Sequence, residues 1–551
     1  MVSPRQAALG IGILLLAGCS SILGLDEFKQ GDGSSTGGSS GQGGTGGAAG
    51  SNNGGAGAGG TGATGGTLSG GTGGTSVGGN AGQSCTPPAE EDCYDGPSGT
   101  QDQGRCRGGK RQCSTEGVWQ ACASQVLPGV ENCSTPNTDE NCDGFECQIT
   151  GASLPGAARA VAPLPNGGFV VATSFTGDVD LDQHIPAGGG NDVYIAAVDI
   201  KGAVEWSLPV TSGGNDSVYA ITTSPGGRVY TLVYLGAPLD LGDGIKAAGC
   251  RLITQEADGS VVRTLNFDPA AELYSAAVDP AGSVVMAGWV AAPVTIGGTP
   301  LNPTFQDPLI VRVRADGSVA WAKLFKGAND NYALGVAADS AGNSYIVGNA
   351  QGTINLGQGD VTADEGDAYI ARLDVNGNTT ASALFGGPGV QEARFVAVDG
   401  SGHPLVAGIY TSTFSMGSSL PQASGEATFV AKLTLGSGGA TADWLWNVNA
   451  TTRGLSSDAA GGASLGLKTN AAFDLTEPVL ANAGLVVRLS PTGSYSWHRQ
   501  VGAPDGEVRA LAGTADGETI VVGRTDSPTV DLGSGPVQTG QGHSYAIKLG
   551  F

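Results

Sequence analysis

The stretch Asp339-Ser340-Ala341-Gly342-Asn343-Ser344-Tyr345-Ile346-Val347 places a small-residue turn directly before an apolar β-strand. It is one copy of a pattern that recurs along residues 148–551, in which a glycine lies in a turn between two apolar, alternating stretches. The repeat glycines are Gly168, Gly227, Gly282, Gly342, Gly402, Gly462 and Gly517. Their spacing of 55 to 60 residues predicts seven copies of one structural unit.

Each unit contains two further predicted strands. The third alternates strictly, as in Tyr369-Ile370-Ala371-Arg372-Leu373, and leads to a tight-turn pair such as Asp316-Gly317 or Asn376-Gly377. Such pairs favour hairpin turns, so a fourth strand should pair beside the third. Tryptophans lie on this fourth strand: Trp206, Trp321, Trp446 and Trp497. Four antiparallel strands in each of seven units predict an all-β fold, a seven-bladed β-propeller, rather than a β-solenoid, whose repeat is usually shorter.

The repeat unit also resembles a known family. An apolar strand, an Asp-x-x-Gly-Asn turn, a second apolar strand and then Asp-x-Phe/Tyr-Ile/Val-Ala-Lys/Arg-Leu make it similar to the bacterial SBBP propeller repeat. The match is best at Asp339–Asn343 with Asp367–Leu373, and the second and sixth units are the most degenerate. The resemblance implies a fold and not an activity.

The last unit is incomplete. The chain ends at Phe551, at the end of a third strand, so the seventh blade lacks its fourth strand. The segment Ile149–Leu154 lies just ahead of the first unit, where a fourth strand lies in every other repeat. We therefore expect this segment to pair with the C-terminal strand and to close the ring.

The N-terminal residues are typical of an export signal. Arg5 precedes an apolar stretch from Ala7 to Leu16 that is too short to cross a bilayer. The sequence Leu16-Ala17-Gly18-Cys19 resembles the lipobox of bacterial lipoproteins; the alternative is a plain secretory signal with a chance cysteine. The resemblance implies a signal peptide at residues 1–18, acylation of Cys19 at the start of a lipid-anchored segment 19–30, and, because Asp does not follow Cys19, the outer membrane.

Two segments separate this anchor from the propeller. Residues 31–84 consist almost entirely of Gly, Ser, Thr, Ala and Asn, and we expect them to form a disordered tether. Residues 85–147 form a small Cys-rich module. The even number of cysteines predicts a disulfide scaffold instead of a zinc site. The eight are Cys85, Cys93, Cys106, Cys113, Cys122, Cys133, Cys142 and Cys147. Cys250, far downstream, should be a buried strand residue.

The Cys-rich module contains half of a calcium-loop pattern. Asp139, Asn141 and Asp143 supply oxygens at alternate positions before Gly144, but Thr150 replaces the final bidentate Glu. The module resembles the Cys-rich "putative metal-binding" modules of bacterial surface proteins, which implies a metal site, and the half loop pattern makes Ca²⁺ the expected ion. The alternative is a disulfide-held spacer.

A second set of acidic residues is expected on the propeller. The loops joining second to third strands, and fourth strands to the next blade, should emerge on one face, where loops carry function. Asp192, Asp307 and Asp367 precede third strands at equivalent positions and are the better candidate ligands for Ca²⁺. The acidic residues of these loops are Asp178, Asp182, Asp192, Asp216, Asp243, Asp330, Asp360, Asp364, Glu365, Asp367, Glu392 and Asp505. The alternative is that they are scattered, solvated charges.

Charge and motif content argue against nucleic-acid binding and against catalysis. The net charge of −24 leaves no basic footprint for nucleic acid. The four histidines are widely separated, and Gly462-Ala463-Ser464-Leu465-Gly466, which matches a nucleophile pattern, falls at a repeat turn. We therefore expect a non-enzymatic surface lipoprotein that displays the propeller as a binding module for an unknown protein or glycan. The alternatives are a propeller-fold lyase or hydrolase acting on an extracellular polymer, and a passive envelope component.

Overall fold

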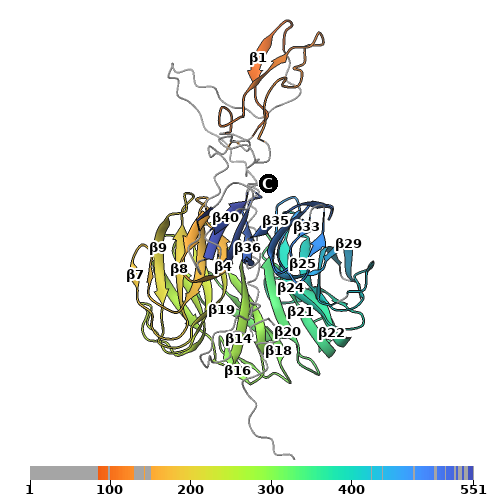
Figure 1. Ribbon diagram of the computed structural model, residues 1–551. Coiled ribbons are helices and arrows are strands. Elements are labelled where there is room, and N and C mark those ends of the chain that lie inside the picture. Colours follow the sequence, from red (N-terminus) through yellow and green to blue (C-terminus); the bar gives the residue numbers. More distant parts are fainter. Residues whose placement is uncertain are drawn as a thin grey trace, which may run out of the picture. The chain divides into compact units, whose positions relative to one another are not determined.

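The computed structural model describes two parts of the chain, a Cys-rich module and a propeller (Figure 1). The described residues are 85–96, 100–128, 142, 151–423, 425–436, 438–475, 478–501, 506–514, 517–525, 529–530, 537–538 and 544–549. All regular secondary structure in these ranges is β. Within the same ranges, nothing helical is long and apolar enough to span a bilayer.

Seven four-stranded antiparallel sheets form the blades of a β-propeller, which confirms the predicted fold. Blades 1 to 3, from inner to outer strand, are β4 (Ala157–Pro163), β5 (Phe169–Phe175), β8 (Asp192–Val198), β9 (Val204–Val210); β10 (Ser217–Thr223), β11 (Val229–Leu235), β12 (Gly249–Gln255), β13 (Val261–Asn266); and β14 (Ala271–Val278), β15 (Val284–Val290), β18 (Asp307–Val313), β19 (Val319–Leu324). Blades 4 to 6 are β20 (Tyr332–Ala338), β21 (Ser344–Asn355), β22 (Asp360–Leu373), β23 (Thr379–Phe385); β24 (Gln391–Val398), β25 (Pro404–Tyr410), β28 (Ala427–Gly436), β29 (Gly439–Val448); and β30 (Ala450–Ser457), β31 (Ala463–Thr469), β34 (Gly484–Leu489), β35 (Tyr495–Val501).

Blade 7 is completed by both ends of the propeller chain. Its strands are β36 (Glu507–Gly513), β37 (Thr519–Arg524), β40 (Ser544–Leu549) and, outermost, β3 (Gly151–Leu154). In this clasp Gly151 lies opposite Ile547 and Leu154 opposite Ser544. The predicted ring closure is therefore confirmed for residues 151–154.

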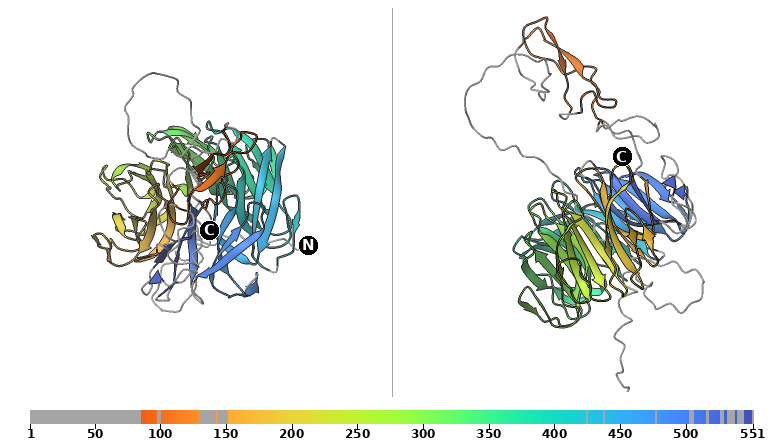
Figure 2. Two further views of the ribbon diagram at one scale, coloured as in Figure 1. Left: turned by 90° about the horizontal axis from the view of Figure 1, so that it is seen from above. Right: turned by 90° about the vertical axis from the view of Figure 1, so that its left-hand side faces the viewer.

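The first strands of the blades are the inner ones, and neighbouring first strands contact each other around the ring (Figure 2, left). The blades pack through alternating apolar side chains. In blade 1, for example, both faces of β5 and β8 are buried, with Val170, Val171 and Ile195 fully inaccessible. We call the end of the ring with the 1–2 and 3–4 turns the turn face, and the opposite end, where first strands begin, the loop face.

Tight turns on the turn face are fixed by the preceding blade. The indole nitrogen of Trp321 in β19 donates to the Val375 carbonyl of the next blade at 3.0 Å. The Trp321 ring also packs against Gly377, where a side-chain Cβ would come within 2.9 Å of the ring carbon Cδ2. Gly377 also has a φ of 82°, which favours glycine. Trp206 and Trp444 make equivalent contacts to Ala257 and Pro491, so these tryptophans join neighbouring blades.

Ion pairs explain the Asp and Lys/Arg of the repeat signature. Asp399 Oδ1 accepts the Ser401 and His403 amides, which closes the 1–2 turn, while its Oδ2 lies 2.6 Å from Lys432 Nζ on the third strand. Pairs of this kind occur in four blades: Asp279–Arg312, Asp399–Lys432, Asp458–Arg488 and Glu518–Lys548. In these four blades the recurrent acid and base brace the turn face from within the blade.

In five blades the connection between the second and third strands forms a small two-stranded ribbon. These pairs are β6 (Val179–Asp180) with β7 (His184–Ile185), β16 (Val294–Ile296) with β17 (Thr299–Leu301), β26 (Phe414–Ser415) with β27 (Ser419–Leu420), β32 (Phe473–Asp474) with β33 (Pro478–Val479), and β38 (Thr529–Val530) with β39 (Val537–Gln538). Figure 1 labels β7 at the outer edge of the ring, beyond β8 and β9. There Gln183 Nε2 donates to the Ser207 carbonyl at 2.8 Å, so the ribbon covers the exposed edge of the outer strand.

The Cys-rich module is held by disulfides around one short hairpin, β1 (Glu90–Cys93) and β2 (Gly109–Gln112). Its bridges are Cys85–Cys113, Cys93–Cys122 and Cys106–Cys142. The predicted disulfide scaffold is confirmed for these six, whereas Cys133 and Cys147 lie outside the described residues. Cys250 is buried in β12, as expected, and burial raises the pKa of its thiol to about 12.

Candidate functional site

Each inner strand carries one β-bulge close to its start, near the loop face. At this point the pairing with the second strand skips one residue. A bulge re-aims a side chain and often lies beside a functional site. The bulged residues of blades 1 to 7 are Arg159, Tyr219, Tyr274, Leu334, Arg394, Arg453 and Arg509.

These seven residues fall into two groups around the axis. Blades 5, 6, 7 and 1, which are consecutive in the closed ring, present Arg394, Arg453, Arg509 and Arg159; we call these four the arginine arc. Blades 2 and 3 present Tyr219 and Tyr274, whose rings meet edge to face with centroids 5.1 Å apart. The ring contact shows that the bulge side chains of blades 2 and 3 lie against each other.

Carboxylates two residues earlier hold two members of the arginine arc. Arg394 Nε donates to Glu392 at 2.9 Å, and Arg509 Nε donates to Glu507 at 3.1 Å. Glu426, before β28, lies 4.0 Å from Arg394 Nη2. These pairs orient the guanidinium groups of Arg394 and Arg509, and they all lie at the loop face.

Arg453 lies between the other two arginines. Burial lowers its pKa, and the charges of Arg394 and Arg509 lower it further, against the opposite influence of Glu507 and Glu426. The charges of Arg394 and Arg509 thus disfavour the charged form of Arg453. This concentration of positive charge contrasts with the net charge of −24 of the chain.

The predicted calcium ligands of the propeller are not brought together. Asp192, Asp307 and Asp367 begin or precede the regular part of the third strands in blades 1, 3 and 4, as expected, and all are buried. Each accepts backbone amides instead: Gly188 donates to Asp192 at 2.8 Å, and Gly327 to Asp307 at 2.9 Å. Burial raises the pKa of Asp192 and Asp367.

Nowhere in the described part of the chain do three or more His, Cys, Asp or Glu side chains form a group able to hold a metal ion. Calcium binding by Asp192, Asp307 and Asp367 stays a prediction. Asp139, Asn141, Asp143 and the lipidation residue Cys19 lie outside the described residues.

Other acidic residues assigned to the loop face lie elsewhere. Asp182 accepts the Ser207 amide at 3.1 Å and Asp243 accepts the Thr264 amide at 2.9 Å, both on outer strands. The reason is that the ribbons fold back along the outer edge instead of standing on the face, so their carboxylates cap unpaired edge amides. Glu392 does lie at the loop face, where Arg394 neutralises it.

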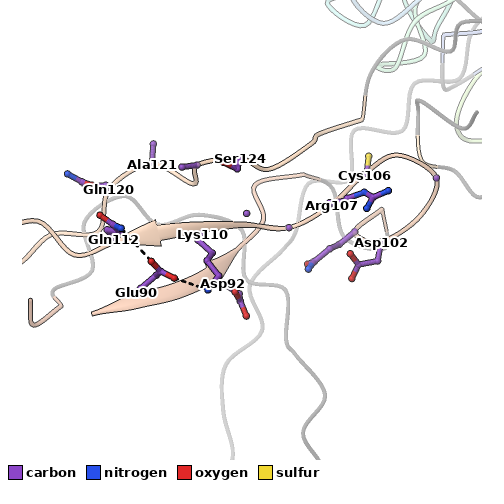
Figure 3. A pocket seen from close by; sticks show the side chains of 15 residues that line it. Glu90, Asp92, Asp102, Cys106, Arg107, Lys110, Gln112, Gln120, Ala121 and Ser124 are labelled. Atoms are coloured by element: carbon purple, nitrogen blue, oxygen red, sulfur yellow. Dashed lines mark hydrogen bonds and ion pairs between the residues drawn. The ribbon is translucent and has the colours of Figure 1, made fainter. Parts of the chain in front are cut away.

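The Cys-rich module has a polar groove of about 890 Å³ beside its hairpin (Figure 3). Glu90 accepts from Lys110 at 2.8 Å and from Gln112 at 3.4 Å, and Asp92 lies near this pair. Asp102 and Arg107 line the other end of the groove. The groove combines both signs of charge and points to no one ligand class.

Sequence reasoning missed the arginine arc. A signal exists, because the bulged residues stand eight or nine positions before the repeat glycines, for example Arg394 before Gly402 and Arg453 before Gly462. Small residues follow at the next position in most blades, such as Ala510 after Arg509. An alignment of the seven units by their glycines would have shown this column.

The chain matches no protein-family model and no curated protein sequence, so the resemblances to SBBP repeats and to lipoproteins stay predictions. Solved structures with similar folds include the WD40 repeats of RRP9, at 9% identity and a TM-score of 0.42, covering 73% of this chain and 97% of that one. The streptogramin B lyase structure is similar at 11% identity and a TM-score of 0.38, with 73% and 97% covered. The Dos1 propeller is similar at 10% identity and a TM-score of 0.35, with 73% and 94% covered.

Proposed function

We propose that this chain is an exported, lipid-anchored protein that presents its propeller on a flexible tether as a non-catalytic binding module. The observation that carries the proposal is the contrast between the two ends of the ring. The turn face repeats the same 1–2 turn in all seven blades and an acid–base pair in four of them. The bulge positions near the loop face instead carry side chains that differ from one side of the ring to the other, with Arg in four consecutive blades, Tyr in two and Leu in one. Individual side chains on a repeated, rigid frame are typical of a binding surface.

The surroundings of the catalytic-looking residues favour binding over catalysis. Ser464, in the string that matches a nucleophile pattern, is buried in β31 and accepts from Arg488 Nη1 at 3.0 Å and from Thr519 at 2.9 Å. His184 in blade 1 and His498 in blade 6 hydrogen-bond to Asp180 and Tyr495. These contacts give each residue a structural role, and they favour no lyase or hydrolase.

Export is supported by the three disulfides, which form in oxidising compartments. Anchoring is supported by the resemblance of Leu16-Ala17-Gly18-Cys19 to a lipobox. Cys19→Ser should release the protein from the membrane fraction, because the acyl chains can no longer be attached. Fractionation followed by detection of the full chain checks this result. A variant that remains in the membrane fraction with unchanged gel mobility would place the anchor elsewhere.

A matched pair of substitutions tests which face binds. Asp330, in the β19–β20 loop, and Asp316, in the β18–β19 turn, are exposed residues of the same region of the chain at opposite ends of the ring. The full-length protein should capture a protein or glycan from envelope extracts, and Asp330→Arg should weaken this capture while Asp316→Arg should not. Equal capture by both variants would remove the loop face from the proposal, and no capture by the parent chain would favour a passive envelope component.

A further inference from the structure

Three of the seven inner strands carry a glutamate two residues before the bulged residue. The glutamates and bulged residues pair as Glu392–Arg394 in blade 5, Glu507–Arg509 in blade 7 and Glu272–Tyr274 in blade 3. In each pair the bulged side chain donates a hydrogen bond to Oε2 of the carboxylate at 2.9 to 3.1 Å. The donor is a charged guanidinium group in blades 5 and 7 and a neutral hydroxyl in blade 3. Glu272 therefore occupies a position at which two other blades supply a positive charge.

The charge of Glu272 is left without a cation. Among the described residues, Glu272 pairs with no Lys, Arg or His, and its Oε1 accepts no hydrogen bond. Burial raises the pKa of Glu272, and the Tyr274 hydroxyl opposes this effect only in part. Blade 3 does supply a base to its turn-face acid, because Asp279 pairs with Arg312. The unpaired acid of this blade is thus the one at the loop face.

Glu272 lies within a strip of aromatic residues that crosses three neighbouring blades. Tyr274 packs edge to face against Tyr219 of blade 2, with ring centroids 5.1 Å apart. Trp289 on β15 is directly opposite Glu272 in the sheet, which places both side chains on the same side of the blade. Trp289 in turn packs edge to face against Tyr332 of blade 4, with ring centroids 6.0 Å apart. We call these four aromatic residues the aromatic strip.

The exposure of these residues suits ligand access. Glu272 and Tyr219 are both partly exposed. Tyr274 and Trp289 are buried, at 6% and 8% exposure, so their rings fix the positions of the exposed groups and exclude water beside them. The face of an aromatic ring attracts a cation, and this attraction is stronger where the groups are desolvated. A partly exposed carboxylate next to aromatic rings is therefore suited to an organic cation.

We propose that Glu272 and the aromatic strip bind the ammonium or guanidinium group of a basic side chain, a lysine or arginine of a protein partner. The bound cation takes the role that Arg394 and Arg509 have in blades 5 and 7. It donates hydrogen bonds to the Glu272 carboxylate and lies against the Tyr219 ring. The proposal deepens the proposed function, on which it rests, because it names the chemistry of the partner at the loop face.

Calorimetry with the full chain tests the site, using tetralysine amide and Nα-acetyl-lysine methyl ester as cationic probes. Nα-acetyl-norleucine methyl ester, which has the same side chain without the amine, is the neutral control. We expect both cationic probes to bind, the peptide more tightly for each amine, and the norleucine ester not to bind. Glu272→Gln should weaken the binding about tenfold or more, because it removes a hydrogen bond between charged groups.

Three further variants keep the test decisive. Glu205→Gln makes the same change at an exposed residue of β9 and should leave binding unchanged, which separates the site from the general attraction of a cation to an acidic chain. Tyr219→Leu removes an aromatic face and should weaken binding about threefold or more. Tyr274→Arg introduces into blade 3 the pair found in blades 5 and 7. It should abolish binding, because the new guanidinium group neutralises Glu272, and the Tm should stay equal or rise.

No binding of either cationic probe, equal binding of the norleucine ester, or equal losses in Glu272→Gln and Glu205→Gln would overturn the site. Equal affinity for each amine of the peptide and of the lysine ester would overturn the protein partner in favour of a small free amine. Binding that depends on Glu272 in a protein that captures nothing from envelope extracts would support the site and overturn the proposed function. Capture that depends on Asp330 without binding of the cationic probes would do the reverse.

Discussion

At the turn face of the propeller, Asp399 lies against Lys432 and accepts two turn amides, whereas at the loop face Asp192 and Asp367 are buried among backbone amides. Burial tends to raise all three pKa values. At Asp399 the Lys432 ammonium and the turn amides outweigh burial and lower the pKa, while at Asp192 and Asp367 burial prevails. The turn face thus uses its charges to stabilise the blades, and the loop face keeps ionisable groups at some expense of stability, which is typical of a functional surface.

The largest effect is expected from opening the ring, because both faces depend on its closure. Deletion of residues 148–155 removes β3, including Leu154, which is fully buried. We expect the Tm of the propeller to fall by about 5–10 °C or more, since several kcal/mol of packing and hydrogen bonding are lost from blade 7. Scanning calorimetry checks this, with deletion of eight residues from the segment 31–84 as the control. An unchanged melt would show that the clasp contributes nothing.

A smaller loss should follow from breaking one turn-face ion pair. Asp399→Asn should destabilise the protein by about 3 kcal/mol, because it leaves the Lys432 ammonium without its buried partner. Urea unfolding measures the effect, and the double variant with Lys432→Met should recover part of it. A loss as large in the double variant as in the single one would mean that the turn hydrogen bonds, not the ion pair, matter at this face.

The smallest effect, and one of opposite sign, is expected at the loop face. Asp367→Asn removes a charge whose ionisation is disfavoured by burial, so its free energy of unfolding at neutral pH should stay equal or rise by about 1 kcal/mol. A clear loss of stability would show that both faces use their carboxylates alike.

The same contrast has a pH signature. Because the pKa of Asp399 is lowered by folding, its stabilisation is complete above the ordinary Asp range and is lost as pH falls through the lowered value. Because the pKa of Asp367 is raised, its penalty is full at neutral pH and is relieved as pH falls through the raised value, above that range. The gain in Asp367→Asn should therefore vanish at a higher pH than the loss in Asp399→Asn, as unfolding at a series of pH values would show.

Much of the fold was predictable because each repeat is recognisable from local sequence patterns, namely a turn glycine between two alternating apolar strands. The seven repeat glycines predicted the number of blades. The chain has no fourth strand after Leu549, so the last blade needed a strand from elsewhere, and Gly151–Leu154 provides it. The disulfide pairing was not predictable, because eight cysteines allow many connectivities. Nor was the course of the ribbons, since the ribbon that begins with Val179–Asp180 is placed by contacts of Asp182 and Gln183 with Ser207 of the outer strand.

The candidate site was less accessible to sequence reasoning for a related reason. A bulge interrupts the two-residue alternation that identifies a strand, so Arg159 and Arg453 break the pattern instead of standing out in it. Acidic residues such as Asp182 and Asp243 are numerous in the loops that were expected to form the site. Their actual role is to accept hydrogen bonds from amides at the edge of the outer strands, which the sequence alone does not show. Electrostatic character at the axis is therefore a property of the assembled ring.

The clasp also has a mechanical meaning. Tension applied to the chain on the N-terminal side of the propeller enters the ring at Gly151, so the first bonds to carry load are those between β3 and β40. Leu154 is packed directly behind this short ladder, and Tyr194 donates to the Pro155 carbonyl at 2.7 Å, so the next strain falls on blade 1. A propeller held by a pulled tether would yield from its outermost strand in blade 7 while the remaining six blades keep their hydrogen bonds.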